Sequence, residues 1–135
     1  VSCPPPGSGG LFGMARDAEA MTIFQNGQED LLVKKSGQVR GRPFDLYDLK
    51  KSVVLLLDHT GNVQADTLVG CRVFIGACEG SFSVRNCVDC TFYVCCRELR
   101  TRCCSSCTFY LGTVMEPMIE RSEKLEFGPF NGSYP

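Results

Sequence analysis

Ten cysteines stand among the 135 residues of this sequence, and their spacing is compatible with three kinds of chemistry. Two Cys-x-x-Cys pairs, Cys87 with Cys90 and Cys104 with Cys107, have the spacing of a four-thiolate zinc site. Disulfide bridges are a second interpretation, although such scaffolds are usually shorter, secreted chains. The third interpretation is that the thiols are free and buried, and pack as small apolar side chains.

Arginines form the second group of residues with a chemical use. Arg100 and Arg102 stand two apart in a segment that alternates apolar and polar residues, so a strand would point both to one face. A guanidinium pairs with phosphate and with carboxylate, and the kind of anion therefore stays open. One interpretation is that Arg100 is presented to an anionic ligand or partner. The other is a solvated ladder of charges, in which each exposed pair contributes about 0–1 kcal/mol.

The single histidine, His59, stands in the polar segment 58–62 and is expected to be a turn residue between repeats rather than a catalytic base. No paired carboxylates, glycine-rich phosphate loop or Cys/His dyad accompany it in the sequence. We therefore expect no self-contained enzyme, no cofactor and no metal site.

The elements that must position these residues repeat themselves. From Phe44 onward, alternating segments recur at steps of 17 to 19 residues, and each is followed by a polar corner and a second apolar segment. Four columns of the aligned repeats are expected to face inward: Leu49, Leu68, Cys87, Cys104, Ser122; Ser52, Cys71, Cys90, Cys107, Leu125; Val54, Val73, Phe92, Phe109, Phe127; and Leu56, Ile75, Val94, Leu111. Two columns are expected to face outward: Asp45, Gln64, Ser83, Arg100, Met118; and Tyr47, Asp66, Arg85, Arg102, Glu120.

This period predicts an all-β fold, a parallel β-helix (solenoid) of about five turns. It is too short for a propeller blade and too rich in strands for a helical repeat. A solenoid stacks equivalent side chains in columns, and the inward columns form one continuous core. Because Leu and Ser share columns with the cysteines, the thiols are expected to be structural fillers rather than zinc ligands. Glu120 is expected to lie over Arg102 and diagonal to Arg100.

Length and charge narrow the class of protein further. With 14 basic and 15 acidic side chains the net charge is −1, which argues against nucleic acid as a partner. The longest apolar run, residues 53–57, is far too short to span a bilayer. Residues 1–20, rich in Pro and Gly, are expected to be a flexible tail or linker, and residues 21–135 a single domain. Reduced cysteines indicate a cytoplasmic location.

Several motifs resemble those of the tubulin-binding cofactor C domain family, and most of all the branch associated with X-linked retinitis pigmentosa. The resemblance covers about residues 21–135. The motifs are 87–103 (CVDCTFYVCCRELRTRC), 37–44 (GQVRGRPF), 58–60 (DHT), 74–76 (FIG), 80–82 (GSF), 117–120 (PMIE) and 127–130 (FGPF).

The resemblance implies a right-handed parallel β-helix that binds and activates an Arf-like small GTPase in its GTP form, or tubulin. Arg100 matches the family's arginine finger, which is supplied in trans, and Glu120 matches an acidic residue that orients it. Arg97 and Glu98 stand where the family usually has two glutamines. Glu98 is therefore expected near the partner's phosphates, where it would repel them unless Arg97 offsets its charge. The outward column adds Arg85 and Arg102 to the expected partner-binding face.

The alternative is a scaffold of the same fold that binds a small GTPase, tubulin or a ciliary trafficking partner without catalysis. Related β-helix domains of cyclase-associated proteins bind actin, which is a third implication of the resemblance. The location expected from it is the cytoplasm, and more specifically the base of a cilium or flagellum.

Overall fold

The computed structural model describes residues 22–130, and all of the regular structure in that range is β-strand. The predicted tail at residues 1–20 lies outside the described residues. The strands are β1 (Ile23–Gln28), β2 (Leu31–Lys34), β3 (Phe44–Lys50), β4 (Val53–Thr60), β5 (Val63–Val69), β6 (Arg72–Arg85), β7 (Thr91–Arg102), β8 (Thr108–Thr113), β9 (Met118–Glu120) and β10 (Glu126–Pro129). Within residues 22–130 there is no helix with the length and apolarity needed to cross a membrane.

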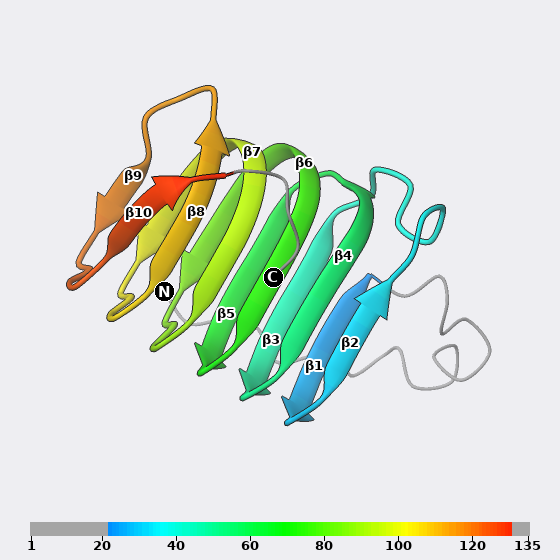
Figure 1. Ribbon diagram of the computed structural model, residues 1–135, viewed down its shortest axis with the longest axis horizontal. Helices are drawn as coiled ribbons and strands as arrows, with labels where there is room; N and C mark the ends of the chain where they lie inside the picture. The colour runs from blue at the N-terminus through cyan, green and yellow to red at the C-terminus, as the bar shows by residue number, and fades with distance from the viewer. Residues whose placement is uncertain (1–21, 131–135) are drawn as a thin grey trace.

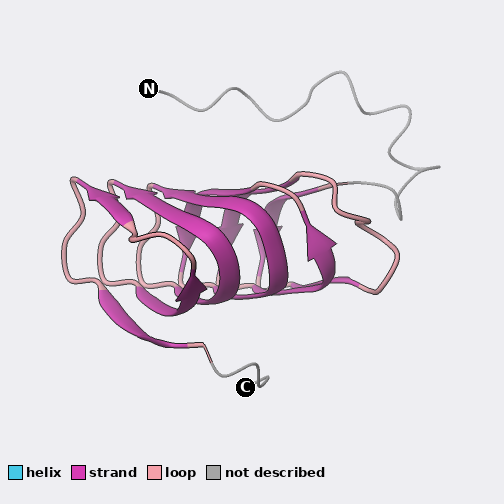
Figure 2. Cartoon of the chain, turned by 90° about the horizontal axis from the view of Figure 1, so that it is seen from above, coloured by secondary structure: helices cyan, strands magenta, loops and turns pink. Residues whose placement is uncertain are grey.

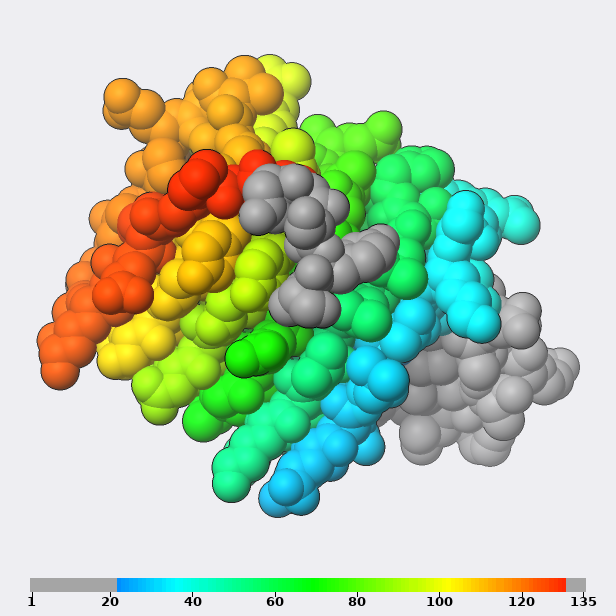
Figure 3. All heavy atoms as spheres, viewed as in Figure 1, coloured from blue at the N-terminus to red at the C-terminus, as the bar shows by residue number. Residues whose placement is uncertain are grey.

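All strand pairs are parallel, and the chain coils into a β-solenoid of six turns (Figure 1). Successive coils stack along one axis (Figure 2), and on the surface the turns follow one another as adjacent bands in chain order (Figure 3). The prediction of a parallel solenoid is confirmed. The predicted five turns become six, because β1 and β2 form a turn ahead of Phe44. Among the described strands this end turn pairs on one side only, and polar residues fill much of β1.

Each turn contributes to two walls. We call one the arginine wall: β1, β3, β5, residues 81–85 of β6, residues 98–102 of β7, and β9. We call the other the apolar wall: β2, β4, residues 72–78 of β6, residues 91–96 of β7, β8 and β10. Strands β6 and β7 run from one wall into the other, and the register between them shifts in that bend.

The strand register confirms the alignment of the predicted columns. Two members face differently from the prediction. Asp66 is buried, because its carboxylate accepts hydrogen bonds from Thr67 and Asn86. Phe127 is 44% exposed, because it lies in the last described turn. On the arginine wall Ser83 pairs with Arg100, and Arg100 with Met118. Inside, the rings of Phe92 and Phe109 stack with centroids 5.0 Å apart. Each fully buried Phe contributes about 1.5–3 kcal/mol from apolar burial, so the ladder is a main source of the fold's stability.

The corner between the end of the arginine wall and the start of the apolar wall is made by two columns of residues with positive φ. Asn, Asp and Gly tolerate this left-handed conformation best, and they supply five of these twelve positions. The first column is Asn26, Asp48, Thr67, Asn86, Cys103 and Arg121, and the second is Glu29, Lys51, Gly70, Asp89, Ser106 and Lys124. Two such bends in every turn reverse the chain sharply enough to join the walls.

Where the inward side chain after a bend is Cys or Ser, it donates a hydrogen bond to the carbonyl two residues earlier. The Cys90 thiol donates to the Val88 carbonyl at 3.3 Å, and the Ser52 hydroxyl donates to the Lys50 carbonyl at 3.0 Å. Cysteine and serine share these columns because both are short and carry a donor. The carbonyl that accepts it also accepts a backbone N–H of the adjacent turn, as Val88 does from Gly70 and Lys50 does from Glu29. The sequence predicted that the cysteines are structural, and the structure adds that their thiols donate hydrogen bonds.

The nine cysteines of residues 22–130 are free thiols, and seven of them are buried. No three His, Cys, Asp or Glu side chains in that range are arranged to hold a metal ion. Burial raises the pKa of the Cys96 thiol to about 12, so this side chain is neutral at physiological pH.

Candidate functional site

A polar groove lies on the outer face of the arginine wall, next to Arg100. Its volume is about 390 Å³, and its walls come from four successive turns. The lining residues are Pro43, Asp45, Asn62, Gln64, Ser81, Ser83 and Arg100. Partial desolvation in this groove raises the pKa of the Asp45 carboxyl. Hydroxyl, amide and guanidinium groups dominate, so the groove can form hydrogen bonds with a polar or anionic partner.

A second hollow of about 210 Å³ adjoins the first and shares Gln64, Ser83 and Arg100 with it. It also contains four residues that the sequence assigned to the partner-binding face or to its finger: Arg85, Arg100, Arg102 and Glu120. The solenoid brings them together because they occupy two neighbouring outward columns of three successive turns. Arg100 stands at the junction of the two hollows.

Arg100 has an exposed side chain that is oriented by an ion pair. Its side chain is 57% exposed, and its Nε lies 3.2 Å from Oε1 of Glu98, whose side chain is only 13% exposed. The Ser81 hydroxyl donates to the same Glu98 oxygen at 3.1 Å. The Ser81 N–H in turn donates to Oδ1 of Asn62 at 2.9 Å. A chain of contacts therefore runs through three turns from Asn62 to Arg100.

The partner of Arg100 differs from the one expected. Among residues 22–130, the carboxylate within ion-pair distance of Arg100 is that of Glu98, whereas Glu120 is exposed and in register with Arg102. The reason is the geometry of a strand: residues two apart on one strand point to the same face, while Glu120 is diagonal and one turn away. Glu98 was expected to repel phosphates. Within this chain its carboxylate contacts Ser81 and Arg100, and the effect on a partner's phosphates stays a prediction.

Two other predicted site residues have different surroundings. Arg97 lies in the bend between the walls, outside both hollows, and its carbonyl accepts the N–H groups of Val114 and Met115 at 3.3 and 3.2 Å. Arg85 lies in the second hollow with its Nε 3.7 Å from Oδ2 of Asp66, a buried carboxylate. The structure therefore places Arg85 with Arg100 and places Arg97 apart from it.

His59 is not in a turn, as the sequence predicted, but near the end of β4, where it is half exposed. Its Nδ1 lies 3.4 Å from Oδ1 of Asp58, which is buried. Oδ2 of Asp58 accepts the N–H groups of Arg40 at 2.7 Å and Val39 at 2.9 Å, and these two bonds hold the pKa of the carboxyl well below its usual range. Asp58 thereby anchors the loop 35–43, whose last residue, Pro43, lines the polar groove.

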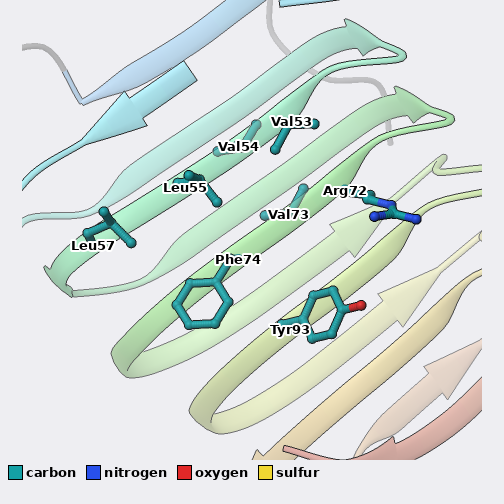
Figure 4. A pocket seen from close by; sticks show the side chains of 8 residues that line it. All are labelled: Val53, Val54, Leu55, Leu57, Arg72, Val73, Phe74 and Tyr93. Carbon is teal, nitrogen blue, oxygen red and sulfur yellow. The ribbon is translucent and has the colours of Figure 1, made fainter. Parts of the chain in front are cut away.

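The opposite face of the molecule has a hollow of a different kind. About 430 Å³ in volume, it lies on the apolar wall, and its side chains come from β4, β6 and β7 (Figure 4). The lining residues are Val53, Val54, Leu55, Leu57, Arg72, Val73, Phe74 and Tyr93. The ring of Phe130 packs 6.0 Å from that of Phe74. Apolar packing is the main contribution that these side chains can make.

Ser81, Asn62 and Pro43 were not identified from the sequence. The columns were aligned from Phe82 onward, and Ser81 pairs with Glu98 one residue earlier in the same register. Extending the alignment by one position would have placed a hydroxyl beside the Glu98 carboxylate. No comparable signal marks Asn62 and Pro43, because they lie in the bends, where the period is interrupted.

The class of protein that this geometry defines is a parallel β-solenoid domain with an exposed, ion-paired arginine beside a polar groove on one wall. The particular family follows from the comparisons. The family model "Tubulin binding cofactor C" matches residues 41–135, and the chain belongs to this family.

The curated relatives are tubulin-specific chaperones. The chain is 26% identical over 112 residues to tubulin-specific chaperone C of Mus musculus, which covers 83% of this chain and 33% of the relative. It is 24% identical to that of Bos taurus over 135 residues, all of this chain and 38% of the relative. The chain thus spans about a third of the length of the curated relatives it matches.

Two solved structures share the fold. Tubulin binding cofactor C from Leishmania major superposes with a TM-score of 0.55 at 20% identity, over 82% of this chain and 52% of the other. Cyclase-associated protein from Cryptosporidium parvum superposes with a TM-score of 0.67 at 13% identity, over 78% and 70%. At these identities the likeness concerns the fold alone.

Proposed function

We propose that this domain binds tubulin, or a small GTPase of the Arf-like kind, and inserts Arg100 into the partner's nucleotide site. Family membership and the relatives' name, tubulin-specific chaperone C, support tubulin as the partner class. The observation that supports the catalytic part of the proposal is the environment of Arg100. Its side chain is 57% exposed, and its Nε is paired with Glu98 on the same strand, β7.

The physical effect of such a residue is electrostatic. Negative charge spreads over the γ-phosphoryl oxygens as the phosphoryl group is transferred to water. A guanidinium supplied in trans neutralises that charge, which raises the rate by about 10³–10⁵. Glu98 contacts the guanidinium of Arg100 through Nε, so the two Nη groups form the edge with which a partner can pair. A partner docked over the polar groove would meet this edge of the guanidinium first.

Single-turnover GTP hydrolysis tests this proposal, with tubulin and a panel of Arf-like GTPases as partners. The wild-type domain should accelerate hydrolysis by at least one of them, and Arg100→Ala should abolish the acceleration while leaving the solenoid folded. The matched control is Arg72→Ala, which removes an exposed arginine from the apolar wall. Equal acceleration by wild type and Arg100→Ala would refute a finger role.

A second candidate function is a scaffold that binds the same partners without catalysis. The observation that favours it is the Glu98–Arg100 ion pair, because a paired guanidinium attracts phosphate less than a free one. Pull-downs with GTP-bound and GDP-bound partners separate the two functions. Binding that depends on the nucleotide, survives Arg100→Ala and comes with no change in the hydrolysis rate identifies a scaffold.

A further inference from the structure

The Glu98 carboxylate is mostly buried, unlike the Arg100 guanidinium that it contacts. Its side chain is 13% exposed, against 57% for that of Arg100. Oε1 accepts both contacts, from Arg100 Nε at 3.2 Å and from the Ser81 hydroxyl at 3.1 Å. Oε1 thus receives donors from two directions, which fixes the orientation of the carboxylate.

Ser81 is itself held in place. Its N–H donates to the Asn62 side chain at 2.9 Å, and its residue is in strand register with Glu98. The hydroxyl therefore approaches Glu98 from the preceding turn, while Arg100 approaches from the same strand, two residues on. Two contacts from different elements restrict the rotamers of a long side chain much more than one contact does.

We infer that Glu98 is a positioning residue for Arg100. It holds Nε in place and leaves the Nη edge to pair with a partner, and Ser81 holds Glu98. An arginine side chain has many rotamers, and one that must find its position only after docking loses catalytic effectiveness. The expected effect on GTP hydrolysis rests on the proposed function. The expected contact between Glu98 and Arg100 does not depend on a partner.

The substitution Glu98→Gln separates geometry from charge. A glutamine amide oxygen can accept the same two hydrogen bonds, from Ser81 and from Arg100, without the negative charge. Glu98→Ala removes both bonds. Glu120→Ala serves as the matched control, because it removes an exposed carboxylate from the same wall without removing a contact to Arg100.

The direct measurement is the NMR signal of the Arg100 Nε–H group in the isolated domain. In wild type we expect a shifted signal that is protected from exchange with water. It should move to the position of a solvated arginine in Glu98→Ala, and stay protected in Glu98→Gln and Glu120→Ala. A signal that is the same in wild type and Glu98→Ala would overturn the inference, whatever the domain does to a partner.

The kinetic measurement is stimulated GTP hydrolysis with the partner that responds to the wild-type domain. Glu98→Ala should lower the maximal stimulated rate about tenfold, with the concentration for half-maximal stimulation changed less than threefold. Glu98→Gln should restore the rate to within about threefold of wild type. A tenfold loss in Glu98→Gln as well would show that charge rather than position matters and would overturn the inference. If wild type stimulates no partner, the proposed function fails, and the NMR signal alone decides whether Glu98 holds Arg100.

Discussion

Asp58 should contribute more to stability than any other acidic side chain in the described part of the chain. Its Oδ2 accepts two backbone N–H groups of the loop 35–43, at 2.7 Å from Arg40 and 2.9 Å from Val39, and Val39 is fully buried. In Asp58→Ala both donors lose their partner. In Asp58→Asn the amide oxygen can keep both bonds, but they are no longer charge-assisted.

The expected magnitudes follow from the hydrogen bonds. A bond to a charged group contributes about 1.5–3 kcal/mol and one between neutral groups about 0.5–1.5 kcal/mol. Water at the edge of the loop screens part of the charge, which favours the lower half of these ranges. We therefore expect the free energy of unfolding at pH 7 to fall by about 1–2 kcal/mol in Asp58→Asn and by about 2–4 kcal/mol in Asp58→Ala.

The pH dependence has a definite sign. The Arg40 and Val39 N–H groups hold the pKa of Asp58 below the unfolded value, so the folded state binds the proton less readily than the unfolded chain. The stabilisation is complete above about pH 5 and is lost as the pH falls through about 4 toward the folded pKa. The stability difference between wild type and Asp58→Asn should therefore shrink from pH 6 to pH 3.

Urea unfolding at pH 6, 4 and 3 measures this difference for wild type, Asp58→Asn, Asp58→Ala and the exposed control Glu116→Gln. Glu116→Gln should stay within about 0.5 kcal/mol of wild type at every pH. A gap between wild type and Asp58→Asn that is constant or grows toward pH 3 would contradict the reasoning.

Two further predictions concern the bends. Cys90→Ser should lower the free energy of unfolding by less than about 1 kcal/mol, because the hydroxyl can donate to the Val88 carbonyl as the thiol does. Cys90→Ala should lower it by about 1–2 kcal/mol. Urea unfolding of both variants measures this, and equal losses would mean that the donor contributes nothing. Gly80→Ala should cost about 1–3 kcal/mol in the same assay and shift the Arg100 Nε–H signal, because the added Cβ would overlap the Asn62 side chain that binds Ser81. The control Gly76→Ala, where the nearest atoms lie 3.6 Å away or farther, should cost much less, and similar losses at both positions would count against the Asn62–Ser81–Glu98 chain.

Part of the candidate site could be predicted from the sequence because strand register is a property of the period. Ser83, Arg100 and Met118 occupy one outward column, and that column is read directly from the spacing. The identity of the carboxylate that pairs with Arg100 could not be predicted in the same way. Glu98 is two residues from Arg100 on the same strand and Glu120 is diagonal to it one turn on, and the choice between them depends on rotamers and burial.

The amino-acid sequence alone determined the solenoid, its core columns and the exposed face on which Arg100 lies, because neighbours in space are one period apart in the chain. The tertiary structure alone decided the first turn of β1 and β2, the anchoring of the loop 35–43 by Asp58, and the contact of Glu98 with Ser81 and Arg100. These features depend on how side chains meet at an end or a bend of the coil, where the period is interrupted and gives no information about distance.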